Sequence, residues 1–205
     1  MPHVKNRRMT KPARRYGGVA LEDRQAERRD RLIRAAIDVS ARLGRDGASV
    51  ALICAEAGLT ARYFYESFPN REALFLAAFG RVQDELFNRI AVRAAGRDPV
   101  RAALAGFFAV LAEFPGPARV FLVDLDEHEP AMKELGRAAG ERFGALFAPD
   151  AANTLAQAGA AGAIIQIARR WVRNGFAEPV DDVVATALPF ARAARPAPDK
   201  NLKKS

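Results

Sequence analysis

The sequence has few of the residues on which many enzymes and metal sites depend. Among its 205 residues there are one cysteine, Cys54, and two histidines. A lone cysteine excludes an intramolecular disulfide, and with a reducing compartment as the default we expect a cytoplasmic protein. His3 lies in a basic, aperiodic segment and Cys54 on a helix face expected to be buried, so no Cys–His nucleophile pair can be proposed. We therefore expect neither an enzyme nor a cofactor.

Long apolar runs and strand-like alternation are missing as well. Half of the residues are hydrophobic, yet no run approaches the ~18 apolar residues of a membrane span. The basic N-terminus is not followed by the apolar core of a secretory signal, so no membrane partner is expected. No segment alternates with period two for long enough to be a strand. The sequence therefore predicts an all-α protein with about nine helices.

The positive charge is concentrated at the two ends of the chain. The net charge is +8, and residues 1–16 hold six basic side chains and no acidic one. The segment 192–205 holds five basic residues and one acidic residue. Residues 32–191 are nearly neutral, with 17 basic and 19 acidic side chains. Basic arms on a neutral body suit contact with phosphate backbones, although a C-terminal tail that merely aids solubility fits equally well.

Apolar periodicity, glycines and prolines divide the chain into helices. Gly44 and Gly47 are expected to end the first helix, and Pro115-Gly116-Pro117 is the strongest stop in the chain. The predicted helices cover residues 24–43, 50–57, 61–67, 71–95, 99–114, 118–125, 131–147, 151–174 and 181–194.

The most informative segment is residues 58–74. Gly58 is expected at a tight turn with positive φ, and Thr60 stands where it can cap a short aromatic-rich helix. In front of it, Ser49 is expected to cap the helix 50–57. This order of helix, glycine-containing turn and short polar helix is that of a helix-turn-helix, whose second helix enters the DNA major groove.

Residues 30–74 resemble the TetR family of bacterial transcriptional regulators. The segment Ile53–Gly58 is similar to the family's Ile-Ala-x-x-Ala-Gly run, with Cys54 at a position where alanine is usual. Further positions that match the family are Thr60, Tyr65, Phe68, Arg71 and Leu74. The chain departs at Glu66 and Ser67, where an aromatic residue and a histidine are frequent. We expect Glu66 to pair with an arginine or to accept a hydrogen bond from a cytosine amine.

The resemblance implies the domain organisation and the function. It implies a three-helix DNA-binding domain over residues 23–72, behind a disordered basic arm at 1–22. A helical ligand-binding and dimerisation domain would follow over 73–194, and a basic tail over 195–205. The expected function is that of a sequence-specific regulator, a ligand-responsive repressor that binds a palindromic double-stranded DNA operator as a homodimer.

Candidate DNA contacts gather around the short helix. Arg62 can bond guanine O6 and N7 through two N–H groups, and hydroxyl groups suit phosphate oxygens. The candidate DNA-binding residues are Ser49, Thr60, Ala61, Arg62, Tyr63, Tyr65 and Arg71.

The remaining candidates concern an effector and a dimer. A cavity lined by aromatic residues of the middle helices would bind a small apolar or aromatic effector. The candidate ligand-binding residues are Phe107, Phe108, Leu111, Phe121, Phe143 and Phe147, with Arg169, Trp171 or His128 as a polar contact. Small residues permit close approach of helices, and the candidate dimer-interface residues are Gly159, Gly162, Ile164, Ile167 and Trp171.

Two alternatives to this function remain open. The chain could be a helical protein-interaction module without DNA-reading function, or a DNA-binding regulator with no small-molecule effector. The acidic segment 124–129, which includes His128, carries groups that bind divalent cations, but such a segment is more often a solvated turn, so no metal site is assigned.

Overall fold

A computed structural model shows the expected all-helical architecture. It describes residues 16–93, 98–122 and 130–196, and within these ranges it contains nine helices and no strand. The helices are α1 (Tyr16–Gly47), α2 (Val50–Ala57), α3 (Ala61–Ser67), α4 (Arg71–Arg93), α5 (Pro99–Glu113), α6 (Pro115–Leu122), α7 (Pro130–Phe147), α8 (Thr154–Arg173) and α9 (Val180–Ala193). The all-α prediction is confirmed. None of the described helices is long and apolar enough to cross a membrane.

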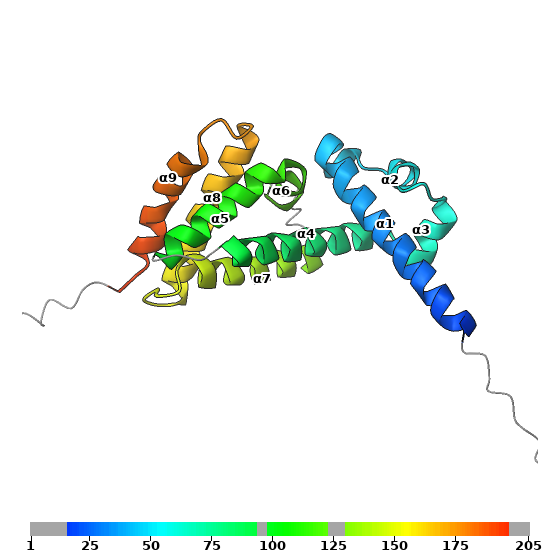
Figure 1. Ribbon diagram of the computed structural model, residues 1–205, viewed down its shortest axis with the longest axis horizontal. Coiled ribbons are helices and arrows are strands. Elements are labelled where there is room, and N and C mark those ends of the chain that lie inside the picture. Colours follow the sequence, from blue (N-terminus) through cyan, green and yellow to red (C-terminus); the bar gives the residue numbers. More distant parts are fainter. Residues whose placement is uncertain (1–15, 94–97, 123–129, 197–205) are drawn as a thin grey trace, which may run out of the picture.

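The first three helices lie at one end of an elongated molecule, and α4 runs from them into the rest of the chain (Figure 1). The helices α1, α2 and α3 pack on one another, and α1 also packs on α4 and α6. The close contact between α1 and α6 depends on Gly116, because a Cβ atom there would lie 3.0 Å from the Cβ of Ala41. The N-terminal unit is therefore in direct contact with two helices of the larger part.

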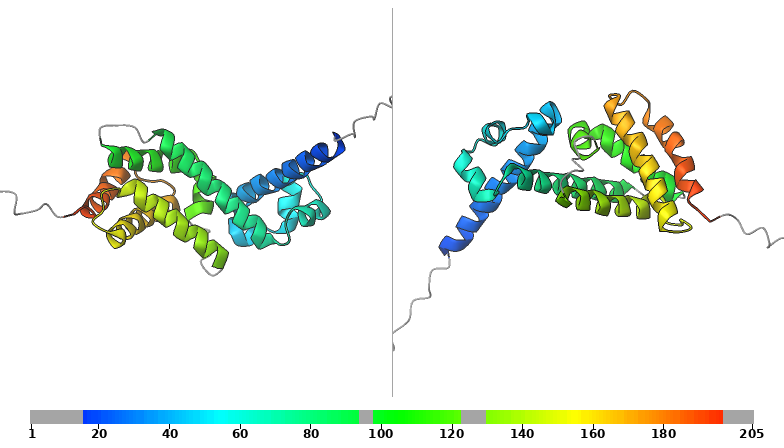
Figure 2. Two further views of the ribbon diagram at one scale, coloured as in Figure 1. Left: turned by 90° about the horizontal axis from the view of Figure 1, so that it is seen from below. Right: turned by 180° about the vertical axis from the view of Figure 1, so that it is seen from behind.

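The larger part consists of α4 to α9, seen from two further sides in Figure 2. The helix pairs α5 and α9, α7 and α8, and α8 and α9 lie against each other. The core between them is aromatic: Phe107 stands with its ring centroid 5.2 Å from those of Phe143 and Phe147, and Phe108 meets Trp171 edge-on at 5.7 Å. Such ring pairs add about 0.5–1.5 kcal/mol each beyond the burial of their area.

Most helix boundaries agree with the sequence prediction to within a few residues, with two corrections. Helix α1 begins at Tyr16, so residues 16–22 are helical where a disordered arm was expected. Helix α6 begins at Pro115, so the Pro-Gly-Pro segment starts a helix as well as ending α5. The physical reason is that the first turn of a helix needs no intrahelical N–H donors, and proline therefore fits there.

Candidate nucleic-acid interface and ligand cavity

The turn between α2 and α3 is built as the sequence predicts. The Ser49 hydroxyl accepts a hydrogen bond from the backbone N–H of Leu52 at 3.3 Å and so caps α2. Gly58 has φ 61°, in the left-handed region, and its N–H donates to the carbonyl of Ala55. The next residue, Leu59, donates to the carbonyl of Cys54 at 2.9 Å. These bonds end α2 and set the direction in which α3 leaves.

Helix α3 has only seven residues, which is too short for a stable isolated helix. Two aromatic side chains attach it to the N-terminal core. Phe64 is 0% exposed and Phe68 2% exposed, and their ring centroids lie 6.1 Å apart. Burial of each such side chain stabilises the fold by about 1.5–3 kcal/mol. The opposite face of α3 is consequently held toward solvent.

Arg62 and Glu66 occupy that outer face. The Arg62 Nε atom donates to Glu66 Oε1 at 2.9 Å, one helical turn away. This hydrogen bond and the carboxylate's charge raise the pKa of Arg62 above its usual value. The prediction that Glu66 pairs with an arginine is thus confirmed. The pair leaves the Arg62 side chain 83% exposed, so its guanidinium remains available to a partner.

Arginines of α1 hold the carbonyl ends of both short helices. Arg31 donates from Nη2 to the carbonyl of Ala57 at 2.5 Å and to that of Gly58 at 3.4 Å. Arg29 donates from Nη1 to the carbonyl of Ser67 at 2.8 Å. The last carbonyls of a helix have no partner inside the helix, so these two cations satisfy groups that would otherwise face water.

The same arginine cluster covers two aromatic rings of the motif. The guanidinium of Arg28 lies 4.7 Å from the ring centroid of Tyr63, and that of Arg29 lies 4.0 Å from the ring of Phe68. These arginines do not stand out in the sequence, because acidic residues of the same helix cancel their charges. The i to i+3 spacing of Arg28 and Arg31 along α1, with Arg29 between them, was the available signal in the sequence.

All seven candidate DNA contacts reach the surface. Ser49, Thr60, Ala61, Arg62, Tyr63 and Tyr65 are exposed, and Arg71 is half-buried beside Glu72 at 3.7 Å. Tyr65 is 64% exposed, whereas Tyr63, under Arg28, is 36% exposed. Thr60 occupies the N-cap of α3, but its side chain makes no cap hydrogen bond. The Thr60 hydroxyl therefore does not cap α3, contrary to the expectation from the sequence.

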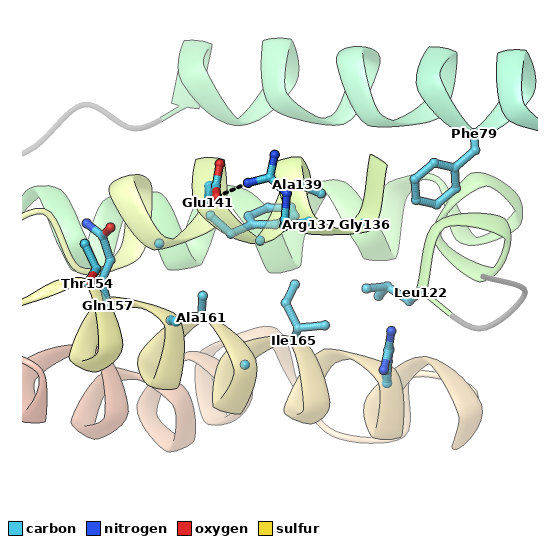
Figure 3. Close-up of a pocket in the computed structure, with 16 residues that line it drawn as sticks. Phe79, Leu122, Gly136, Arg137, Ala139, Glu141, Thr154, Gln157, Ala161 and Ile165 are labelled. Atoms are coloured by element: carbon cyan, nitrogen blue, oxygen red, sulfur yellow. Dashed lines mark hydrogen bonds and ion pairs between the residues drawn. The ribbon is translucent and has the colours of Figure 1, made fainter. Parts of the chain in front are cut away.

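A cavity of about 690 Å³ lies between α7 and α8. Phe79 of α4 and Leu122 of α6 contribute to one end of it, and Thr154 and Gln157 to the other, with Ala161 and Ile165 of α8 between them (Figure 3). Glycines and alanines make up much of both walls. Charged groups at its boundary are Arg137, Glu141 and Arg169. Arg169, which the sequence offered as a polar contact of a ligand, thus lines the cavity.

Most of the predicted ligand-binding residues do not line this cavity. Phe143 lines the cavity. In contrast, Phe107, Phe108, Leu111 and Phe147 are all 0% exposed and pack in the core. The reason is that α5, which carries three of them, is covered by α4, α6, α7 and α9. The Phe121 side chain and the whole segment 123–129, with His128 and its acidic neighbours, lie outside the described residues.

The prediction of the dimer-interface residues also needs correction. Ile164 is 0% exposed and Trp171 3% exposed, so both face the core of their own chain. Trp171 donates from Nε1 to the carbonyl of Glu178 at 2.9 Å, which fixes the α8–α9 connection. Gly159 and Gly162 are exposed and Ile167 is half-buried. Gly162 also borders the cavity between α7 and α8.

The helix-turn-helix matches a known family. Residues 32–78 match the family model described as bacterial regulatory proteins, tetR family. Over this segment the chain is similar to the TetR family. No curated protein sequence matches the chain, so the sequence similarity to the family rests on this segment.

Solved structures of TetR-like regulators share the fold across most of the chain. A TetR-like transcriptional regulator from Rhodococcus sp. RHA1 is 18% identical with a TM-score of 0.65, over 80% of this chain and 93% of that one. FadR from Bacillus subtilis, in complex with stearoyl-CoA, is 18% identical with a TM-score of 0.63, over 79% and 96% of the two chains. The multidrug binding protein EbrR, complexed with imidazole, is 20% identical with a TM-score of 0.70, over 84% and 97%.

Proposed function

We propose that this chain is a member of the TetR family, and that it is a dimeric, sequence-specific DNA-binding transcriptional regulator that acts as a ligand-responsive repressor. The proposal rests on how α3 is held. Phe64 and Phe68 are buried in the N-terminal core, and Arg62 is exposed on the opposite face of the helix. Residues 23–72, extended back to Tyr16 by α1, would form the DNA-binding domain. Residues 73–194 would form the ligand-binding and dimerisation domain.

On DNA, α3 would lie in the major groove. Arg62 stands near the N-terminal end of α3, where a recognition helix approaches base edges, and its guanidinium suits guanine O6 and N7. Glu66 would keep that guanidinium oriented and would accept from a cytosine amine when the pair opens. The hydroxyls of Ser49, Thr60 and Tyr65 are exposed and suited to phosphate oxygens.

A homodimer would use the outer face of α8 and α9. Leu155 of α8 is 83% accessible and Phe190 of α9 is 48% accessible, and Gly159, four residues after Leu155, is exposed as well. Exposed large apolar side chains on adjoining helices are typical of an interface between subunits. A two-fold pair of α3 helices about 34–36 Å apart would then read a palindromic operator.

The cavity is connected to the DNA-binding helices through two of its own walls. Phe79 and Leu122 belong to α4 and α6, and α1 packs on both of these helices. Helix α1 in turn carries Arg29 and Arg31, which hold the ends of α3 and α2. An effector that binds one arrangement of α4 and α6 more tightly would therefore bias the position of α3. The ligands of FadR and EbrR support the effector part of the proposal.

The direct test is selection of a binding site from random duplexes, followed by affinity measurement on the selected site and on unrelated DNA. Arg62→Ala should weaken specific binding by ~1–3 kcal/mol and relax the preference at one position. Arg137→Ala is the matched control, because Arg137 also pairs with a glutamate four residues later, Glu141, but on α7. Its DNA affinity should stay at the wild-type level in the absence of effector.

The outcomes separate the alternatives. If Arg62→Ala loses the same affinity for the specific and the unrelated duplexes, Arg62 contacts phosphate and its assignment to bases is refuted. Absence of any salt-dependent DNA binding would favour an interaction module without DNA-reading function. Sequence-specific binding that no cavity ligand alters would favour a regulator without an effector.

A further inference from the structure

The cavity between α7 and α8 has a shape that restricts its ligand. Its lining on α8 extends from Thr154 to Arg169, which at 1.5 Å per residue is a length of about 22 Å. A volume of about 690 Å³ over that length corresponds to a mean cross-section of roughly 30 Å². Figure 3 shows the lining residues of α8 following one another along the helix. The cavity is a long, narrow slot.

Two glycines keep this slot open. A glycine inside a helix costs ~1 kcal/mol relative to alanine, so a helical glycine usually marks a close contact. Gly144 has such a reason, because a Cβ there would lie 2.8 Å from Cγ of Gln157. Gly140 and Gly162 line the same slot, yet no atom lies within 4 Å of a Cβ built on either. Both therefore stand in open space at the border of the slot, where a larger side chain would reach into it.

The slot is bordered mainly by apolar side chains, with the paired Arg137 and Glu141 along its α7 side and a further cation at one end. Between its ends it is bordered by Ala161, Ile165 and Phe143. Thr154 and Gln157 provide an uncharged polar end. At the other end stands the guanidinium of Arg169, half-buried and in contact with Gln166 at 3.3 Å. Arg137, on the α7 side, pairs with Glu134 and Glu141.

We infer that the ligand is an amphipathic molecule with an unbranched acyl or alkyl chain and an anionic head group. The chain lies between α7 and α8 along Gly140 and Gly162, and the head group meets Arg169. This inference rests on the proposed function, since it specifies the effector of the same cavity. A compact or branched ligand would leave much of a slot of this length unfilled.

Titration calorimetry of the full-length protein with octanoate, decanoate, dodecanoate and palmitate tests whether the ligand carries an unbranched acyl chain. Affinity should rise about fourfold per methylene, the equivalent of ~0.8 kcal/mol, until the slot is full. Affinity that does not depend on chain length overturns the inference. So does tighter binding of a planar anthracene carboxylate than of the unbranched acids.

Two variants test the location. Gly140→Leu places a side chain in the open slot and should abolish binding of the long acids, while its melting temperature stays at or above wild type. Gly80→Leu is the matched control: Gly80 also has no atom within 4 Å of a Cβ, but it does not line the slot. Equal affinity for dodecanoate in both variants and wild type overturns the placement between α7 and α8.

A third variant tests the head group. Wild type should prefer dodecanoate to dodecanol by at least tenfold, and Arg169→Met should remove that preference while it keeps the dependence on chain length. An unchanged preference in Arg169→Met overturns the head-group assignment. DNA binding distinguishes this inference from the proposed function. If the protein binds its operator but not the fatty acids, only the inference about the slot is refuted. If it binds the fatty acids and its operator affinity does not change, only the effector role is refuted.

Discussion

The attachment of α2 by Arg31 leads to a quantitative prediction for Arg31→Met. Methionine keeps much of the aliphatic stem and removes the guanidinium that bonds the carbonyls of Ala57 and Gly58. A hydrogen bond to a charged donor contributes about 1.5–3 kcal/mol. The contact to Gly58, at 3.4 Å, lies at the edge of hydrogen-bonding distance and adds little. Since the site is only partly buried, we expect a loss of ~1–2 kcal/mol in the free energy of unfolding.

Arg34→Met is the matched control on the same helix. Arg34 is 62% exposed and pairs with Asp30 at 2.9 Å in an i to i+4 arrangement. Such exposed pairs contribute ~0.3–0.5 kcal/mol, and Asp30 keeps a second partner in Arg81 at 2.7 Å. The two variants therefore lose the same charge at positions three residues apart. Arg31 bonds the carbonyl at the end of α2, whereas Arg34 pairs with a carboxylate of its own helix.

Urea denaturation followed by far-UV circular dichroism measures both losses, provided that the slope with urea is the same in all three proteins. Equal losses in Arg31→Met and Arg34→Met would refute the argument that Arg31 fastens the end of α2. Operator affinity should also fall in Arg31→Met, with an unchanged dependence of log affinity on log salt. A slope reduced by ~0.9 would instead show that Arg31 neutralises a phosphate.

Three further predictions address the arm, the dimer and the α5 cap. Removal of residues 1–15, which hold six basic side chains, should flatten the salt dependence of DNA affinity by ~0.9 for each phosphate that the arm had neutralised, and an unchanged slope would make the segment irrelevant to DNA. Gly159→Arg, at a position with no atom within 4 Å of a Cβ, should yield a folded monomer in sedimentation and lose operator binding, whereas a Gly159→Arg dimer would contradict the α8–α9 interface. Hydrogen bonds from the backbone N–H of Arg101 and, second, from the Arg192 side chain lower the pKa of Asp98 below its ordinary 3.8. The ionised carboxylate therefore stabilises the fold fully above that pH, and this contribution is lost as the pH falls through the lowered pKa. The stability difference between wild type and Asp98→Ala should therefore shrink on acidification below about pH 4 in thermal melts, and a difference that is constant with pH would rule out the ionised cap.

Local features of this protein follow from the sequence alone. The Ser49 cap, the left-handed Gly58 and the start of α5 at Pro99 are set by neighbours within one helical turn. The pairing of Arg62 with Glu66 is equally local, since residues four apart on a helix lie on the same face. The helix-turn-helix, with its buried Phe64 and Phe68, is a compact motif of this kind, and its function could be predicted for the same reason.

Only the tertiary structure decided which side of each long helix meets which neighbour. Trp171 was expected at a subunit surface and lies in the core, and Phe107 was expected at a cavity and is enclosed. An apolar residue is equally suited to a core, a cavity wall or an interface, because the hydrophobic effect has no direction. The attachment of α2 by Arg31 spans 26 residues of sequence, and the slot between α7 and α8 is open at Gly140 because both helices are positioned by other helices of the fold. Neither the ion partners nor the empty space of such sites is encoded by a local pattern, since both depend on where distant segments come to lie.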